Sequence, residues 1–377
     1  MFNKPLVMHA TTPDGRYHRQ VLLKELGAAG QAKLAGARVL VVGAGGLGCP
    51  ALQYLAAAGI GCLGILDFDV VEASNLHRQI LYTEEDIGRL KAEVAAARIK
   101  ALNPAGQVEV FTIRLESSNA LGILARFDLV IDGSDNFPTR YLVNDACVLL
   151  DKPLVYGSIF RFEGQVSVFN WPVNGIKTNY RDLFPTPPEP GTVDNCSEAG
   201  VIGVLPGIIG SMLANEAIKL ITGMGVSLAN RLLTYNALNS AVYELEIVPA
   251  QHTTTFAPKT ASAFKNMNYD WFCQDSEDHY TELSGADFNR FLLEKAPLVI
   301  DVRNVWEQPK PTEFDYIQIP LAELESRLSQ LKTEQPIVVF CQTGVRSITA
   351  ANLIAHRLGH SFVYNLKGGI TQWKSNQ

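Results

Sequence analysis

Short apolar runs alternate with segments of helical spacing through the first 160 residues. Arg16–Gly36, Cys49–Gly59 and Glu84–Leu102 read as helices, and the last of them stops at Asn103-Pro104. The runs that read as buried strands are Arg38–Val42, Leu63–Asp69, Val108–Arg114, Asp128–Asp135 and Pro153–Phe160. Because strands and helices alternate, we expect an α/β fold with a doubly wound parallel sheet.

The pattern changes after Gly164. Gln165–Asn170 and Leu232–Val248 look antiparallel, with the apolar helical run Ile202–Gly223 between them. The stretch Pro249–Asp278 is rich in Thr, Ala and Asn and reads as a linker. A second set of buried strands follows at 298–303, 337–340 and 362–366. We therefore expect a first domain at residues 1–250, a linker at 251–279 and a smaller α/β domain at 280–377.

Composition narrows the class of protein. A net charge of −6 argues against a nucleic-acid binder, which usually presents a basic face. The six cysteines form no C-x-x-C pair, which suits a reducing compartment. Residues Val39–Leu66 carry no charge, but seven glycines and Pro50 divide them into strand, turn and helix rather than a membrane span. The N-terminus has no apolar signal core, so we expect a cytoplasmic protein.

A glycine turn follows the first strand. Gly43, Gly45 and Gly48 fit G-x-G-x-x-G between a strand and a helix, where backbone amides and a helix N-terminus hold phosphates. Asp67 closes the next strand, where a carboxylate can accept hydrogen bonds from ribose hydroxyls. These features predict a Rossmann-like nucleotide-binding domain without specifying NAD.

Cationic and acidic side chains downstream distinguish between nucleotides. Arg78 and Lys91 follow the second strand, and a triphosphate that loses pyrophosphate needs such cations because negative charge grows on the leaving group. Asp135 and Asn136 follow a further strand, where a carboxylate can hold magnesium against phosphate. Each residue alone reads as a surface charge or a turn. Their joint placement at strand ends favours a ligand site, and the absence of a Walker loop excludes P-loop chemistry.

Together these motifs resemble the MoeB/ThiF adenylyltransferases, relatives of the ubiquitin-activating enzymes, from about Arg16 to Val248. The matching stretches are RYHRQ (Arg16–Gln20), GAGGLG (Gly43–Gly48), DFDVVEASNLHRQ (Asp67–Gln79), GRLKAE (Gly88–Glu93) and DGSDNFPTRY (Asp132–Tyr141). The resemblance implies that ATP adenylates the C-terminal glycine of a small ubiquitin-like sulfur carrier, with release of pyrophosphate.

The resemblance also implies roles for individual residues. Arg78 and Asp135 would be catalytic, with Asp135 holding Mg²⁺, and Arg19 would reach into the neighbouring subunit's site, which implies a homodimer. The residues implied in contacts with ATP or its magnesium are Gly46, Asp67, Ser74, Asn75, Leu76, His77, Arg78, Lys91, Asp135 and Asn136.

Two further features bear on this first domain. Cys196 lies in a polar loop after four prolines, a poor place for a buried thiol, and the resemblance implies that it can receive the activated carrier as a thioester or acyl disulfide.

Many relatives bind structural zinc through two C-x-x-C pairs. Here Asn179 and Asp182 stand where the first pair would be, and the second pair is absent, so we expect no zinc.

The second domain carries a cysteine between a strand and a helix. Cys341, Gln342, Thr343, Gly344, Val345 and Arg346 form a loop in which backbone N–H groups and a helix N-terminus favour a thiolate. Tyrosine-phosphatase loops place five residues between Cys and Arg, whereas this tighter loop has four and suits a single sulfur atom. With DVRNVWE (Asp301–Glu307) and LKGGITQW (Leu366–Trp373), residues from about Tyr280 to Trp373 resemble a rhodanese domain, in which Cys341 would carry a persulfide. Thr312–Tyr316 departs from the usual His-Ile-Pro-Gly-Ala segment.

The two resemblances predict one combined activity. Adenylation makes a carboxylate electrophilic, and a persulfide supplies nucleophilic sulfur, so the product would be a carrier thiocarboxylate for molybdopterin, thiamine or tRNA thiolation. The sulfur donor would be a cysteine desulfurase persulfide or thiosulfate. Two alternatives stay open at this point: an NAD-dependent oxidoreductase with a phosphatase-like domain, and a non-catalytic scaffold that binds the carrier.

Overall fold

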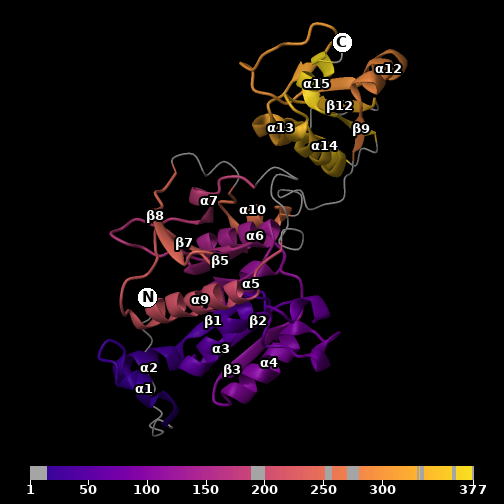
Figure 1. Cartoon of the computed structure of the whole chain (residues 1–377). Coiled ribbons are helices and arrows are strands. Elements are labelled where there is room, and N and C mark those ends of the chain that lie inside the picture. The colour runs from indigo at the N-terminus through magenta and orange to yellow at the C-terminus, as the bar shows by residue number, and fades with distance from the viewer. Residues whose placement is uncertain are drawn as a thin grey trace. The chain divides into compact units, whose positions relative to one another are not determined.

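The computed structural model describes residues 15–187, 200–250, 257–269, 280–328, 331, 335–358 and 362–375. The chain divides into two compact units, and the boundary between them follows Tyr269. Each unit contains its own sheet and its own hydrophobic core (Figure 1).

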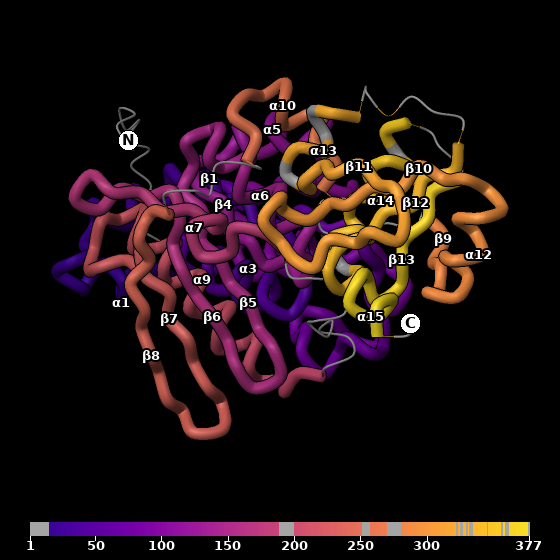
Figure 2. The backbone as a smooth tube through the Cα atoms, turned by 90° about the horizontal axis from the view of Figure 1, so that it is seen from above, coloured from indigo at the N-terminus to yellow at the C-terminus, as the bar shows by residue number. Residues whose placement is uncertain are grey.

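The sheet of the first unit has eight strands in the order β3-β2-β1-β4-β5-β6-β7-β8. From β3 to β5 in this order neighbouring strands are parallel, and from β5 to β8 they are antiparallel. β7 and β8 run side by side at the edge of the sheet (Figure 2). The strands are β1 (Arg38–Val42), β2 (Cys62–Leu66), β3 (Gln107–Phe111), β4 (Leu129–Asp132), β5 (Leu154–Phe160), β6 (Glu163–Phe169), β7 (Arg231–Asn236) and β8 (Ala241–Glu246). The strand order reverses beside β1, as a doubly wound sheet requires.

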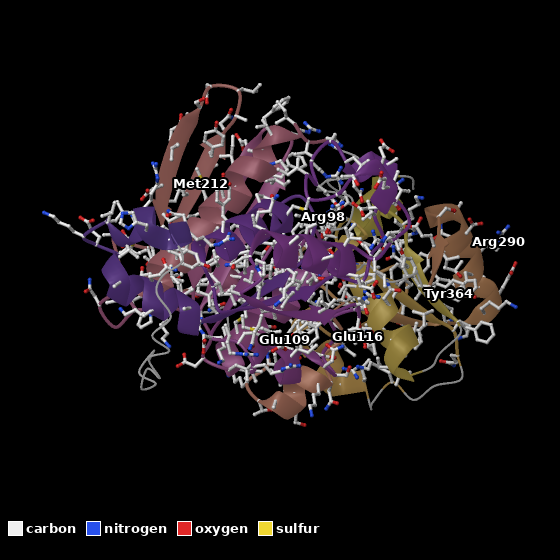
Figure 3. All side chains as sticks on the ribbon, turned by 90° about the horizontal axis from the view of Figure 1, so that it is seen from below. Arg98, Glu109, Glu116, Met212, Arg290 and Tyr364 are labelled. Atoms are coloured by element: carbon white, nitrogen blue, oxygen red, sulfur yellow. The ribbon has the colours of Figure 1, made fainter. Side chains whose placement is uncertain are left out.

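Helices cover both faces of this sheet. On one face α2 (Gly27–Gly36), α3 (Gly48–Ala58), α4 (Lys91–Leu102) and α9 (Val204–Thr222) pack into one core cluster. α5 (Ala120–Leu124) and α6 (Phe137–Leu149) pack together on the other face. Among the described residues α9 is the one helix long and apolar enough to cross a membrane. It instead packs against α3, β5 and β6, which makes it a core helix (Figures 1 and 3, where Met212 marks α9).

Two expected helices are interrupted by glycine. The segment expected to be helical from Glu84 to Leu102 forms a short 3-10 turn, then Gly88 at φ +84°, and α4 begins only at Lys91. Likewise α1 (His18–Val21) is separated from α2 by a turn that ends at Gly27 with φ +56°. A positive φ cannot continue a right-handed helix, and glycine adopts it at little cost.

Part of the expected linker packs against the first unit. α10 (Ala261–Lys265) begins at Thr260, whose hydroxyl accepts a hydrogen bond from the Ala263 N–H, and it contacts α6. Phe264 is fully buried, and the Tyr269 hydroxyl donates a 2.8 Å hydrogen bond to Asp145 on α6. Composition did not reveal this segment, because the contacts of Phe264 and Tyr269 form only once the chain has folded.

The second unit has a parallel five-stranded sheet in the order β11-β10-β12-β13-β9. One core cluster includes residues of α13 and α14, and the other includes residues of α12 and α15. Arg290 on α12 points to solvent, and Tyr364 lies on β13 (Figure 3). The elements are β9 (Thr281–Leu283), α12 (Gly285–Lys295), β10 (Leu298–Asp301), β11 (Ile317–Gln318), α13 (Leu321–Arg327), β12 (Ile337–Phe340), α14 (Val345–Leu358), β13 (Val363–Leu366) and α15 (Gly369–Ser375).

Candidate functional site

A cavity of about 320 Å³ lies at the carboxyl ends of β1, β2 and β4, where the strand order reverses. This is the place where open α/β sheets bind ligands. The sequence-predicted residues that line it are Gly43, Gly45, Gly46, Asp67, Arg78, Lys91, Asp135 and Asn136. The fold thus brings residues from four separate stretches of chain into one cavity wall.

The glycine turn leaves no room for side chains at two positions. A Cβ on Gly43 would lie 2.9 Å from the Gly133 carbonyl oxygen, and the Gly43 φ is +86°. A Cβ on Gly48 would lie 1.9 Å from the Gly43 carbonyl oxygen. Gly48 does not line the cavity; it allows α3 to begin directly against the turn.

Asp67 is held in place by two backbone donors. Its Oδ2 accepts a 2.7 Å hydrogen bond from the Ala44 N–H, and its Oδ1 accepts one of 2.9 Å from the Asp69 N–H. Burial raises the pKa of Asp67, and Lys91 opposes that shift. Each carboxylate oxygen has a second lone pair, so a ribose hydroxyl can still donate to this group.

Four cationic side chains line the cavity, two of which the sequence analysis missed. The Lys91 ammonium lies 3.0 Å from the Asp69 carboxylate, and Arg78 donates a 3.0 Å hydrogen bond to the Ser74 carbonyl oxygen. Arg114 and Arg140 also line the wall. Arg114 follows the end of β3, so the strand-end argument could have identified it. The position of Arg140, buried in the first turns of α6, depends on tertiary packing.

The polar residues at the end of β4 and in the loop that follows it have distinct roles. Asp132 is fully buried, and its Oδ1 accepts hydrogen bonds from the Ser134 N–H and hydroxyl, which shapes the loop. Burial raises the pKa of Asp132. Asp135 is exposed and lines the cavity. Asn136 caps α6, because its Oδ1 accepts a 2.9 Å hydrogen bond from the Thr139 N–H.

Besides Gly48, five residues predicted for the nucleotide site do not line this cavity. Ser74, Asn75, Leu76 and His77 form the turn that precedes Arg78, and Asn75 accepts a hydrogen bond from the Glu72 N–H. Arg19 lies on α1, whose Gln20 donates to the Ala58 carbonyl at the end of α3. The glycine turn lies at the other end of α3, about 16 Å away along 11 residues. Arg19 therefore lies far from the cavity of its own chain.

Cys196 lies outside the described residues. The two positions at which relatives would carry the first pair of zinc thiolates are described, and they are joined by hydrogen bonds. Asn179 and Asp182 form a reciprocal cap at the start of α7 (Tyr180–Leu183), and Asp182 Oδ1 also accepts a 3.0 Å hydrogen bond from the Ala250 N–H. In the described part of the chain no three His, Cys, Asp or Glu side chains are grouped so that they could hold a metal ion.

In the second unit Cys341 follows β12 and begins a compact loop. Its Sγ accepts hydrogen bonds from the Gly344 N–H at 3.2 Å and from the Ser347 hydroxyl at 3.5 Å. Gly344 has φ +93°, and a Cβ there would lie 2.9 Å from the Gly368 amide nitrogen. The loop is further fixed from that side, because the Ile370 N–H donates to the Cys341 carbonyl oxygen at 2.9 Å.

Side chains from the β10 loop hold the rest of the cysteine loop. Arg346 forms two 2.6 Å hydrogen bonds with Glu307, and this pairing lowers the pKa of Glu307 to about 2. The Gln342 side chain accepts from Arg303 at 2.9 Å and donates to Thr371 at 2.9 Å. Thr343 is exposed.

The segment Thr312–Tyr316, which departs from the usual rhodanese pattern, contributes to the core. Phe314 makes edge-to-face contacts with Phe288, Phe340 and Trp373, at centroid distances of 5.1 to 5.7 Å. An aromatic cluster of this kind stabilises the segment through burial and ring geometry. The fold of the unit is therefore maintained at the point where the sequence departs.

Comparisons with known proteins agree with this geometry. A model described as the ThiF family matches residues 17–256, and a model of the rhodanese-like domain matches residues 286–376. "Probable adenylyltransferase/sulfurtransferase MoeZ" of Mycobacterium tuberculosis is 42% identical over 375 residues, covering 95% of this chain and 92% of the relative. "Sulfur carrier protein adenylyltransferase" of Thermus thermophilus is 56% identical over 62% of this chain and 86% of its own length.

A eukaryotic relative and a solved structure extend these matches. "Adenylyltransferase and sulfurtransferase MOCS3" of Drosophila sechellia is 40% identical over 96% of this chain and 83% of the relative. The crystal structure of E. coli MccB with MccA-N7isoASN matches 65% of this chain and 75% of its own with a TM-score of 0.56. At 21% identity that structure shows a shared fold only.

Proposed function

The chain belongs to the ThiF family and carries a rhodanese-like domain, and from this premise we propose how its two sites act on one substrate. The first unit adenylates the C-terminus of a small ubiquitin-like sulfur carrier with ATP, and the second unit supplies sulfur to the activated carboxylate. The observation that carries the proposal is that one chain holds both a polar cavity at the switch point of a doubly wound sheet and a cysteine loop fixed by backbone and side-chain hydrogen bonds.

In the adenylation step a carboxylate oxygen of the carrier attacks the α-phosphorus of ATP, and pyrophosphate leaves. The glycine turn and the N-terminus of α3 supply backbone N–H groups to the phosphates. Asp67 accepts from the ribose, and Arg78 and Lys91 stabilise the charge that develops on the leaving pyrophosphate. For Lys91 this requires that its ammonium exchange the Asp69 carboxylate for a phosphate.

Asp135 fits a magnesium ion that is shared with the nucleotide. Magnesium is usually bound by one or two protein carboxylates together with substrate phosphates, so a single exposed carboxylate on the cavity wall is sufficient. The ion would neutralise phosphate charge. Asn136 is less suited to metal binding, because its amide oxygen already caps α6.

We propose that a second copy of the chain completes the cavity with Arg19. Its neighbour Gln20 contacts the end of α3 opposite the cavity, and this position supports an action of Arg19 in trans. A homodimer that exchanges Arg19 would add one cation to each phosphate site. Mixing an Arg19→Ala protein with an Asp135→Ala protein should then restore part of the activity, because one site of each mixed dimer keeps both residues.

In the sulfur step Cys341 first takes the sulfane sulfur from a cysteine desulfurase persulfide or from thiosulfate. The terminal persulfide sulfur attacks the acyl carbon of the adenylate and AMP leaves, which gives an acyl disulfide between the carrier and Cys341. A thiol then attacks the Cys341 sulfur, which forms a new disulfide and releases the carrier thiocarboxylate. We propose that Cys196 can receive the carrier covalently. Its thiolate either attacks the acyl carbon of the adenylate, which gives a thioester as AMP leaves, or attacks the acyl-bearing sulfur of the acyl disulfide, which gives an acyl disulfide on Cys196 as the Cys341 thiolate leaves.

The decisive experiment measures each step separately. The protein is mixed with ATP, Mg²⁺ and candidate ubiquitin-like carriers, and pyrophosphate release and carrier mass are followed. Cys341→Ser should still release pyrophosphate, because Cys341 belongs to the separate fold of the second unit. Cys196→Ser should release it too, because the covalent step proposed for Cys196 follows adenylation. Cys341→Ser should give no thiocarboxylate from a sulfane donor. Carrier binding without pyrophosphate release would instead support a scaffold, and hydride transfer with NAD would support an oxidoreductase.

We further propose a cytoplasmic, zinc-free protein whose product serves molybdopterin or tRNA thiolation. The hydrogen bonds of Asp182 to Asn179 and Ala250 join the segments that zinc would join in relatives, which supports the absence of zinc. Elemental analysis after purification without chelator should find well under one zinc per chain. A stoichiometric content would show that this proposal is wrong.

A further inference from the structure

Tyr82 is a buried residue behind the nucleotide cavity that the proposed chemistry does not use. Its hydroxyl donates a 2.7 Å hydrogen bond to the Ala44 carbonyl oxygen and lies 3.3 Å from the Lys91 carbonyl oxygen. Only 5% of the residue is exposed, and burial raises the pKa of Tyr82, so the phenol remains a neutral donor. One hydroxyl therefore contacts both the glycine turn and the first residue of α4.

The hydrogen bond to Ala44 fixes the direction of a neighbouring donor. In a trans peptide the C=O of Ala44 and the N–H of Gly45 point in opposite directions. Tyr82 holds this carbonyl toward the buried side, with a further 3.2 Å contact from the Cys49 thiol. The Gly45 N–H must then point away from Tyr82. Gly45 lines the cavity, and its N–H has no hydrogen-bond acceptor within the described residues.

The remainder of the same turn is fixed independently. The Ala44 N–H donates to Asp67, and Gly43 adopts a φ that other residues rarely adopt. Asp67 holds the N–H of Ala44. The plane of the peptide between Ala44 and Gly45 also depends on the hydrogen bond that the Ala44 carbonyl oxygen accepts from Tyr82. The second contact of the Tyr82 hydroxyl is the carbonyl oxygen of Lys91, and the side chain of Lys91 lines the cavity.

We propose that Tyr82 is a positioning residue for the phosphate groups of the nucleotide. Its hydroxyl orients the Gly45 N–H into the cavity and ties the glycine turn to the start of α4, so that this donor and the Lys91 cation are presented together. The inference rests on the proposed function, because it assumes that a nucleotide occupies the cavity. Tyr82 does not itself contact the ligand.

Tyr82→Phe removes the hydroxyl and leaves the ring. Titration calorimetry of the full chain with Mg²⁺-ATP should show an affinity about tenfold lower than wild type, because this is the change in affinity that corresponds to the loss of one typical hydrogen bond. Adenosine, which has no phosphate, should bind with an affinity within about twofold of wild type. A merely structural role for Tyr82 would weaken both ligands alike or neither.

Tyr141→Phe is the matched control. Tyr141 is also fully buried, and its hydroxyl donates a 3.0 Å hydrogen bond to the Phe184 carbonyl oxygen outside the cavity. This variant should lower the melting temperature without changing ATP affinity. Wild-type ATP affinity in Tyr82→Phe, or an equal loss for adenosine, would overturn the inference. Failure of the wild-type protein to bind ATP would instead overturn the proposed function.

Discussion

Replacing Asp145 by Asn tests the buried contact that anchors the end of the first unit. Asp145 forms a two-point ion pair with Arg181, with N–O distances of 2.8 and 2.7 Å, and both side chains are 2% exposed. Asp145 also accepts the Tyr269 hydroxyl, and the Arg181 guanidinium lies 4.9 Å from the centre of the Tyr141 ring. The substitution therefore leaves a buried positive charge without its counter-ion.

Breaking a buried ion pair by removing one partner costs about 3–5 kcal/mol. Asn still accepts one hydrogen bond, so we expect the lower end, about 3 kcal/mol of unfolding free energy for the first unit. Urea denaturation should report this loss as a lower midpoint. Arg181→Met in addition to Asp145→Asn should recover at least 1 kcal/mol, because the orphaned charge is then removed.

A matched exposed pair provides the control. Lys177 and Asp151 form an ion pair whose side chains are 38% and 49% exposed. Asp151 has φ +51°, a conformation that Asn adopts readily, so Asp151→Asn removes the charge without backbone strain. It should cost under about 1 kcal/mol. If Asp145→Asn costs no more than Asp151→Asn, or if the second substitution recovers nothing, the reasoning about burial is refuted.

Three further predictions concern single residues. Asp69→Asn should free Lys91 from its ion pair and strengthen ATP binding, as measured by calorimetry. The gain should be at most about fivefold, because the Asp69 side chain is about half exposed. Weaker binding would show that Asp69 itself contributes to the nucleotide site. Gly344→Ala should destabilise the second unit by about 1–3 kcal/mol in calorimetric melting, because it combines φ +93° with a Cβ 2.9 Å from the Gly368 nitrogen; an unchanged transition would contradict this. Glu307 has its pKa lowered from 4.5 to about 2, so its pairing with Arg346 stabilises the fold above pH 4.5 and is lost as pH falls toward 2. Glu307→Gln should lower the unfolding free energy of the second unit by about 1–2 kcal/mol at neutral pH, a value reduced because Arg346 is partly exposed to solvent. Acid unfolding curves of the variant that stay parallel to wild type between pH 5 and 2 would contradict this prediction.

The sequence was sufficient where a residue's role depends on its immediate neighbours along the chain. Gly43 and Asp67 each follow a buried strand directly, and Asp135 comes three residues after the end of another. Parallel strands bring their carboxyl ends together, so the cavity wall could be predicted. The cysteine loop could be identified in the same way, because Cys341 lies between a strand and a helix that are both evident in the pattern.

The sequence was insufficient where a role depends on packing between distant segments. No motif or pattern in the sequence marks Tyr82, and only the folded chain places its hydroxyl on Ala44, 38 residues earlier. Arg140 and Tyr269 likewise acquire their partners through α6 and the segments packed on it. The turn at Gly88 was missed because glycine in a helical pattern does not reveal its φ until tertiary contacts fix it.

The docking of Tyr269 on α6 shortens the chain that connects the two units. The expected linker had 29 residues, 251–279, but with Tyr269 anchored only the ten residues 270–279 separate it from the described part of the second unit, and ten residues span at most about 35 Å. Asp145, the anchor, lies nine residues beyond Asn136 at the cavity rim, which is about 13 Å along α6. On the proposed function, the acceptor site and the domain that carries Cys341 are therefore connected by far fewer residues than the expected linker contains, which favours a sulfur donor on the same chain over one that must be captured from solution.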